Sequence, residues 1–186
     1  MTVTGPDGQP RCGWATSAPE YIEYHDTEWG KEIRDDHGLF ERMTLEGFQS
    51  GLSWITILRK RENFRKAFDH FDPQKIAAYG SDDFDRLMAD AGIVRNRLKI
   101  NATITNARAL LELEEGELTD LLWSFQPENR PAPKTFDDVP ATTPESVAMS
   151  KALKKKGFVF VGPTTAYALM QATGIVNDHL ATCIAR

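Results

Sequence analysis

Cysteine is scarce in this sequence, and long apolar runs are missing. Only two of the 186 residues are cysteines, Cys12 and Cys183, and they lie near opposite ends of the chain. A framework of several disulfides is therefore excluded, and a chain of this length buries a sizeable core without one. No segment approaches the roughly 18 consecutive apolar residues of a membrane helix, and the N-terminal residues lack the apolar core of a signal peptide. We therefore expect a cytoplasmic protein without a membrane partner.

Internal repeats and low-complexity segments are absent as well. Hydrophobic residues make up 41% of the chain and charged residues 26%, which is typical of a folded globular protein and not of a disordered one. We expect one domain over residues 1–186, with two small lobes as the upper limit, and a monomer.

The chain has no general excess of positive charge, since its net charge is −5. This balance argues against a protein that coats nucleic acid, but not against an enzyme that touches DNA on one face. Basic residues gather in three segments, at 59–66, 95–99 and 151–156. These segments are either solvated helix faces or contacts to an acidic partner, and charge alone leaves both interpretations open.

The spacing of apolar residues is helical almost throughout, so we predict an all-α fold. Ser17 and Glu20 form a capping-box pattern at the start of one helix, and Thr143 precedes Pro144 at the start of another. Further helices are expected over about 39–49, after Ser53 to about 68, from Asp72-Pro73, from Ser81-Asp82, over about 98–111, and from Thr164 to the C-terminus with an interruption near Gly174.

Three segments depart from this pattern. Residues 91–94 contain a glycine and interrupt the helices on either side, and four prolines between 127 and 140 indicate an extended connection. Phe158–Val161 is the only strand-like run, and the Gly162-Pro163 pair cuts it short.

Both cysteines and two of the four histidines form a possible metal site. His179 and Cys183 are four residues apart, which on a helix places both side chains on one face. Cys12 and His25 lie near the other end of the chain. Two thiols and two imidazoles are the ligand set of a structural zinc site. The alternative is two buried free thiols and two ordinary histidines.

Aromatic residues are concentrated in the first third of the chain, where three of the four tryptophans lie. They form either part of a hydrophobic core or a box that sandwiches a flat or cationic ligand. The residues concerned are Trp14, Tyr21, Tyr24, Trp29 and Trp54.

Glu46 interrupts an apolar stretch. A buried carboxylate is costly unless donors or a positive charge meet it. Glu46 therefore either reads a ligand or lies on the exposed face of its helix.

Motifs along nearly the whole chain resemble those of the 3-methyladenine DNA glycosylase I family, bacterial enzymes of alkylation repair. They extend from residue 11 to Cys183, and their specificity lies in the combination. The matching segments are Arg11-Cys-Gly-Trp14, Tyr24-His-Asp26 with Glu28-Trp-Gly30, Leu45-Glu-Gly47 with Gly51-Leu-Ser-Trp54, Asp90-Ala-Gly-Ile93, Ser150-Lys-Ala-Leu-Lys-Lys155, Gly157-Phe158 with Phe160-Val-Gly162, and Val176-Asn-Asp-His179.

The resemblance implies a helix-hairpin-helix DNA glycosylase fold with a zinc-stapled second lobe formed by the N- and C-terminal segments. The helix-hairpin-helix lobe would span about 36–125, with its hairpin at Ala89 to Val94, and the zinc lobe about 11–30 plus 141–186. The hairpin keeps only Gly92 of the usual proline and two glycines. The family's four ligands of one structural zinc ion fall on Cys12, His25, His179 and Cys183.

The resemblance also implies that the protein hydrolyses the N-glycosidic bond of 3-methyladenine in alkylated double-stranded DNA, releases the free base and starts base excision repair. The family's catalytic, base-reading glutamate falls on Glu46, and its base pocket on Tyr24 and Trp54, with Tyr21, Trp14 and Trp29 around them. We expect hydrolysis without strand cleavage, because no lysine is placed as a lyase nucleophile. The residues expected to contact DNA are Gly51, Leu52, Gly92, Arg95, Arg97 and Lys99.

Two other functions fit parts of the sequence. A catalytic zinc hydrolase needs an open coordination position with a bound water, and four protein ligands argue against it. A non-enzymatic, zinc-stabilised DNA-binding module would have no use for a buried carboxylate inside an aromatic box.

Overall fold

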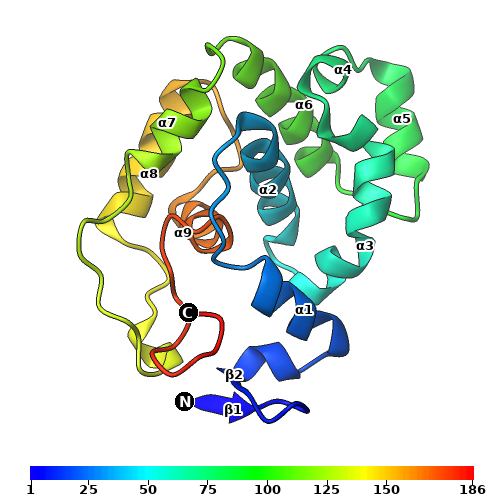
Figure 1. Ribbon diagram of the computed structural model, residues 1–186. Helices are drawn as coiled ribbons and strands as arrows, with labels where there is room; N and C mark the ends of the chain where they lie inside the picture. The colour runs from blue at the N-terminus through cyan, green and yellow to red at the C-terminus, as the bar shows by residue number, and fades with distance from the viewer.

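Helices make up most of the chain, as the spacing of apolar residues predicts (Figure 1). The computed structural model describes all 186 residues, and none of its helices is long and apolar enough to cross a membrane. The elements are β1 (Thr2–Thr4), β2 (Pro10–Cys12), α1 (Pro19–Thr27), α2 (Asp36–Gln49), α3 (Trp54–Ala67), α4 (Pro73–Ala77), α5 (Ser81–Ala89), α6 (Arg97–Leu111), α7 (Glu117–Trp123), α8 (Pro144–Lys155) and α9 (Pro163–Ala172), with short 3-10 turns η1 (Gly13–Thr16), η2 (Asp69–Phe71) and η3 (Phe136–Asp138).

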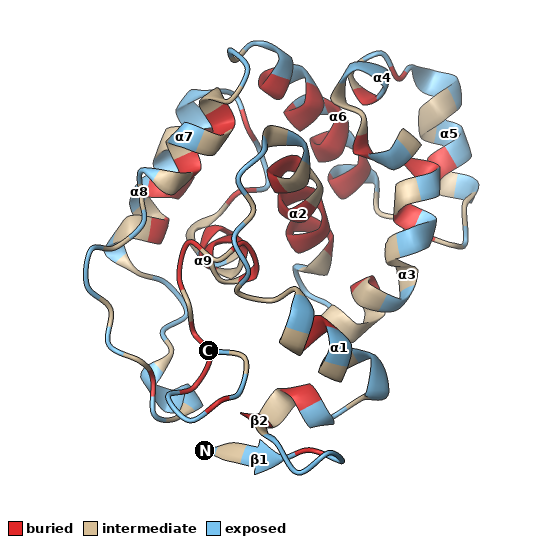
Figure 2. Cartoon of the chain, in the orientation of Figure 1, coloured by how far each residue is buried: buried red, intermediate tan, exposed pale blue.

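Helix α2 lies at the centre of the molecule. It packs against α3, α6, α7 and α9, and every residue from Leu39 to Phe48 except Glu41 is buried (Figure 2). Because nearly all sides of this helix are covered, its polar side chains are buried along with its apolar ones. Arg42 and Glu46, which are one turn apart, are therefore only 7% and 6% exposed.

Local capping chemistry explains several of the helix starts. Asp72 accepts hydrogen bonds from the backbone N–H groups of Gln74 and Lys75 at the start of α4, and Thr143 accepts one from Ser146 at the start of α8. The capping box at Ser17 is wrong. Ala18 is the N-cap of α1, and the Ser17 hydroxyl donates instead to the carbonyl of Trp14.

The expected strand at Phe158–Val161 is not formed. The Asn106 side chain donates to the Val159 carbonyl and accepts from the Val159 N–H, so these backbone groups pair with a side chain instead of a strand. Phe160 has a φ of 60°, which no strand accommodates. The only sheet is the unpredicted hairpin of β1 and β2, where Thr2 lies opposite Cys12.

The C-terminal segment also differs from the expected helix. Helix α9 ends at Ala172, and residues 173–186 form turns with no regular helix. This tail lies beside the N-terminal hairpin (Figure 1), where the Ile184 N–H donates to the Pro10 carbonyl and the hydroxyls of Thr2 and Thr182 are 3.0 Å apart. The two termini are thus held together.

Gly174 makes the turn into this tail possible. Its φ is +77°, and an added Cβ would lie 2.8 Å from the backbone N of Glu32 and from the carbonyl C of Lys31. Gly116, at φ +82°, has no atom within 4 Å of the same position. The two glycines share the backbone cost of a side chain at positive φ, but only Gly174 adds a clash with backbone.

We expect Gly116→Ala to lower the free energy of unfolding by about 1–2 kcal/mol, the ordinary cost of a left-handed alanine. Gly174→Ala should lower it by clearly more, because Lys31 and Glu32 must also move. Urea unfolding of both variants, followed by circular dichroism, measures the difference. Equal losses for the two variants would show that the close packing at Gly174 contributes nothing.

Candidate ligand cavity and metal cluster

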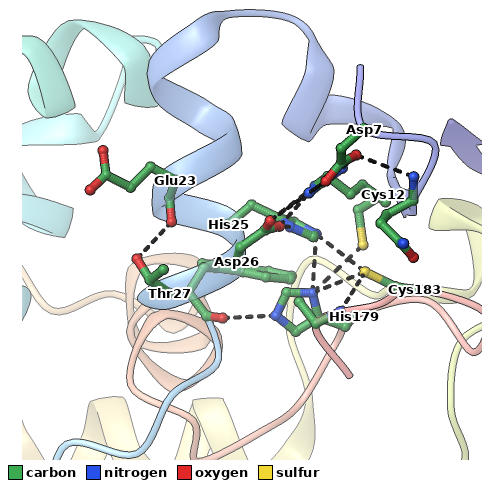
Figure 3. Close-up of polar contacts among 12 residues, drawn as sticks. Asp7, Cys12, Glu23, His25, Asp26, Thr27, His179 and Cys183 are labelled. Carbon is green, nitrogen blue, oxygen red and sulfur yellow. Dashed lines mark hydrogen bonds and ion pairs between the residues drawn. The ribbon is translucent and has the colours of Figure 1, made fainter. Parts of the chain in front are cut away.

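The four cysteine and histidine side chains meet at the base of α1 (Figure 3). Cys12 ends β2, His25 lies in the last turn of α1, and His179 and Cys183 lie in the C-terminal tail. All four are buried, and their ligand atoms lie within 4.8 Å of one another. The set can hold a metal ion. The structure therefore brings together all four predicted ligands, although His179 and Cys183 do not share a helix.

The distances inside this ligand cluster are close. His179 Nδ1 lies 3.2 Å from His25 Nε2, 3.6 Å from Cys183 Sγ and 3.8 Å from Cys12 Sγ. Cys183 Sγ lies 3.4 Å from His25 Nε2. One nitrogen of each ring and both sulfurs therefore point to a common centre.

The other nitrogen of each histidine has its own partner. His25 Nδ1 lies 2.6 Å from the Asp26 carboxylate, and His179 Nε2 lies 2.8 Å from the Trp29 carbonyl oxygen. Asp26 also accepts hydrogen bonds from the Arg11 guanidinium, which holds the pKa of the Asp26 carboxyl below its usual range. These partners fix which ring nitrogen faces the centre of the cluster.

Burial without a cation disfavours charge on the ligands. It raises the pKa of the Cys12 thiol to about 12 and lowers the pKa of His179 to about 4. A bound cation favours the thiolate and the neutral imidazole, so a metal ion would release the thiol protons and keep the rings neutral.

A cavity of about 300 Å³ lies next to this cluster. Helices α1, α2, α3 and α9 and the segment around η1 supply its walls. The cavity contains every residue that the sequence placed around a ligand, and its full lining is Trp14, Tyr21, Tyr24, Trp29, Glu46, Gln49, Trp54, Ala168 and Gln171. We call it the aromatic cavity.

Trp14 packs edge to face against two rings of the cavity, and Trp14 and Trp29 pack against the histidines. Trp14 lies 5.3 Å from Tyr21 and 5.2 Å from Trp29, centroid to centroid, at interplanar angles of 87° and 81°. Trp14 also lies 5.2 Å from the His25 ring, and Trp29 lies 4.7 Å from the His179 ring. The ligand cluster therefore forms the support behind one wall of the cavity.

Glu46 supplies the only carboxylate of the aromatic cavity. No protein group donates a hydrogen bond to it or forms an ion pair with it, although the side chain is almost completely buried. Burial raises the pKa of Glu46 to about 7, and the positive charge of Arg42 opposes that rise. A buried carboxylate without donors is an acceptor available to a ligand.

Two of the expected DNA contacts, Gly51 and Leu52, lie on a tight turn between α2 and α3. Gly51 has a φ of +80°, and Leu52 is 38% exposed. The Gln49 side chain donates to the Leu52 carbonyl, and the Leu52 N–H donates to the Gln49 carbonyl. The turn is therefore held in place while the Leu52 side chain reaches solvent.

The expectation that Lys99 contacts phosphates is wrong for this geometry. Lys99 is 8% exposed, and its ammonium donates to the carbonyl oxygens of Phe48, at 2.8 Å, and of Ser50, at 2.5 Å. Burial lowers its pKa. Lys99 satisfies orphan carbonyls at the end of α2 and so anchors the turn that carries Leu52.

The other three expected DNA contacts lie at the connection between α5 and α6. Arg95 and Arg97 are exposed there. The Gly92 N–H already donates to Asp90 Oδ1 at 2.7 Å, and an added Cβ would lie 3.2 Å from the Asn63 side chain. Gly92 therefore serves the packing of this turn against α3.

Three residues of the cavity lining were missed from the sequence: Gln49, Ala168 and Gln171. Gln171 stands among apolar residues in α9, in the segment Ala168-Leu-Met-Gln-Ala172, as Glu46 does in α2. That interruption was a usable signal.

Comparison with known proteins gives a consistent result. The family model described as methyladenine glycosylase matches residues 14–186. The chain is 53% identical to DNA-3-methyladenine glycosylase 1 of Escherichia coli over 178 residues, which cover 93% of this chain and 95% of that protein. It is 49% identical to DNA-3-methyladenine glycosylase of Haemophilus influenzae, with 93% and 96% covered.

Solved structures agree with these sequences. A crystal structure of 3-methyladenine DNA glycosylase I superposes with a TM-score of 0.90 at 49% identity, covering 95% of this chain and 99% of that one. The Staphylococcus aureus enzyme, whose structure was described as the basis of its 3-methyladenine recognition, superposes with a TM-score of 0.87 at 35% identity, covering 94% and 95%.

The raised pKa of Glu46 predicts how stability depends on pH. The folded protein binds this proton up to about pH 7, whereas the unfolded chain releases it near 4.5. The stabilisation is therefore complete below pH 4.5 and is lost as the pH rises through about 7. Glu46→Gln removes the titration, so the variant should become more stable than the parent as the pH rises, by up to about 3 kcal/mol at pH 8.

Urea unfolding of both proteins at pH 4, 6 and 8 measures this difference. Glu23→Gln, on the exposed face of α1, controls for the substitution itself. A stability difference between Glu46→Gln and the parent that does not change with pH would contradict the assignment of a buried, unpaired carboxylate.

Proposed function

The chain belongs to the methyladenine glycosylase family, and we infer from this that it is a DNA glycosylase that hydrolyses the N-glycosidic bond of 3-methyladenine in alkylated DNA. The observation that carries the proposal is the Glu46 carboxylate, which is buried in the aromatic cavity without a protein partner. Release of the free base starts base excision repair.

The chemistry of the lesion explains what such a cavity needs. Alkylation at the ring nitrogen makes the base cationic, and the base then leaves the sugar as a neutral molecule. Little protonation of the leaving group is required. The protein's main task is to extrude the damaged nucleotide from the stack and to hold its base.

The aromatic cavity suits a flat, cationic base. Electron-rich faces of Tyr24 and Trp54, whose centroids are 5.4 Å apart, favour a positive ring, and Glu46 accepts hydrogen bonds from the exocyclic amino group. Guanine carries an oxygen acceptor in that place, so its hydrogen-bond pattern opposes Glu46. The positive charge of the bound base lowers the pKa of Glu46 and keeps the carboxylate ionised.

We assign one structural zinc ion to the ligand cluster. A tetrahedral zinc ion with bonds of about 2.0–2.3 Å separates its nitrogen and sulfur ligands by about 3.3–3.8 Å. The four separations given above, 3.2 to 3.8 Å, fit that geometry, and all six pairs of ligand atoms lie within 4.8 Å. Four protein ligands leave no position for a catalytic water, which disfavours a zinc hydrolase.

We further assign the connection between α5 and α6 as the hairpin of a helix-hairpin-helix motif. The exposed Arg95 and Arg97 beside it would contact phosphates, and Leu52 on its anchored turn would face the minor groove. The lobe over about 36–125 then carries the DNA contacts, and the lobe of residues 11–30 plus 141–186 carries the zinc. We expect the protein to act in the cytoplasm as a monomer on double-stranded DNA.

A non-enzymatic DNA-binding module is the second candidate. It would share the zinc site and the exposed arginines, but it would not retain a carboxylate at this energetic cost inside an aromatic cavity. Base release separates the two functions.

Incubation with methylated duplex DNA should release 3-methyladenine as a free base, identified by chromatography, with the strands left intact. Glu46→Gln should bind free 3-methyladenine about tenfold more weakly or worse, because it loses charge-assisted hydrogen bonds. Its loss in base release should be smaller, since the cationic base leaves easily. Glu41→Gln, on the same helix but paired with Arg65, is the matched control. No released base with the parent protein would refute the enzyme.

The purified protein should contain one equivalent of zinc by metal analysis. Cys183→Ser should lose the zinc, and its free energy of unfolding should fall by several kcal/mol, since metal binding is coupled to folding. Cys183 does not line the aromatic cavity. The ligand cluster therefore affects base binding only by supporting the wall formed by Trp14 and Trp29. Native protein that releases base normally and contains no zinc would overturn this assignment.

A further inference from the structure

The α9 wall of the aromatic cavity contains one side chain with hydrogen-bonding groups, Gln171. A glutamine offers a carbonyl oxygen on one side of its amide and an NH2 group on the other. Which of the two faces a ligand decides whether Gln171 attracts donors or acceptors. The surroundings of the amide decide that orientation.

The NH2 group of Gln171 is bound by Asp178. Gln171 Nε2 lies 2.9 Å from Asp178 Oδ2, and the same oxygen accepts a hydrogen bond from the Tyr167 hydroxyl at 2.5 Å. The other Asp178 oxygen lies 2.8 Å from the Arg130 guanidinium. Asp178 is 1% exposed, its Oδ2 is bound by donors only, and its Oδ1 forms the ion pair without a hydrogen bond, so Oδ2 acts as an acceptor.

A carboxylate in this setting admits only one orientation of the neighbouring amide. Reversing Gln171 would place its carbonyl oxygen against the Asp178 oxygen, which repels it. The Gln171 carbonyl oxygen must therefore face away from Asp178. No protein group donates to that oxygen, and it is not among the buried atoms that lack a partner. It is therefore open to the aromatic cavity that Gln171 lines.

We propose that Gln171 is a specificity-determining residue, whose carbonyl oxygen is a second acceptor that selects a 6-amino purine over a 6-oxo purine. The proposal rests on the proposed function and deepens it. The amino group of the damaged adenine carries two N–H donors, one for Glu46 and one for Gln171. A 6-oxo purine presents an oxygen to both acceptors, and each of them opposes it.

The division of labour between the two acceptors follows from their charge. The Glu46 carboxylate gains from the positive charge of the lesion, so it distinguishes a cationic base from a neutral one. The Gln171 amide carries no net charge and responds mainly to the hydrogen-bond pattern. Its effect therefore persists with a neutral free base, which makes it measurable without DNA.

The test compares the affinities of two free bases, 3-methyladenine and 3-methylhypoxanthine, measured by quenching of tryptophan fluorescence. Gln171→Met keeps the length of the side chain and removes the acceptor. It should weaken 3-methyladenine binding about fivefold to tenfold and leave 3-methylhypoxanthine binding unchanged or tighter, so the ratio of the two affinities falls. Gln171→Ala, as a second variant, should lower the ratio in the same direction.

Tyr167→Phe is the matched control. It removes another donor to Asp178 without changing the cavity, so it should leave the ratio at the parent value. Circular dichroism and metal content establish that each variant is folded. Equal weakening of both bases by Gln171→Met, or an unchanged ratio in both Gln171 variants, would overturn the proposal.

The same data separate this proposal from the proposed function. If the parent protein binds 3-methyladenine and Gln171→Met keeps the parent ratio, only the role of Gln171 fails. If the parent binds neither base and releases none from methylated DNA, the proposed function fails and the role of Gln171 fails with it.

Discussion

The convergence of Cys12, His25, His179 and Cys183 is the constraint on which the rest of the site depends. These residues come from β2, α1 and a C-terminal tail that has no regular helix of its own. A tail made of turns has no continuous backbone ladder, so the side chains that it contributes to the cluster add to the few backbone hydrogen bonds and buried apolar residues that hold it in place. Trp14 and Trp29 pack on the two histidine rings, so the position of the histidines sets the position of this wall of the cavity.

The charges beside the aromatic cavity favour the ionised form of Glu46. Behind Tyr24, the Glu28 carboxylate is shared by Arg42 and Arg61, so the arginines are in excess by one charge. The Arg42 guanidinium lies 5.5 Å from the Tyr24 ring and one turn from Glu46, which has no donor of its own. An ionised Glu46 balances that excess, and its free lone pairs are left for the ligand. The protein thus retains an energetically unfavourable group in its core, as functional sites often do.

Lys99, which the sequence suggested as a phosphate contact, instead supports the turn that carries Leu52. We propose that this turn faces DNA. Lys99 lies in the first turn of α6, and its ammonium donates to carbonyls at the C-terminal end of α2. Its ammonium links the connection that carries Arg95 and Arg97 to the turn that carries Leu52. Lys99 therefore connects the two elements that we propose to face DNA, and the exposed arginines remain available.

The sequence by itself determined the helical fold, the four members of the ligand cluster and six of the nine residues that line the aromatic cavity. Helical periodicity and capping depend on residues close together in the sequence, so they can be recognised there. Cysteine, histidine and a glutamate among apolar residues can be recognised as candidate site residues by their side-chain chemistry alone. Only the tertiary structure decided that Lys99 is buried, that His179 and Cys183 meet without a helix, and that Phe158–Val161 is not a strand. Each of these outcomes depends on a partner distant in sequence: the end of α2 for Lys99, β2 and α1 for the tail, and Asn106 for Val159. The orientation of Gln171 belongs to the same class, because Asp178 and Arg130 fix it through contacts that no local pattern encodes.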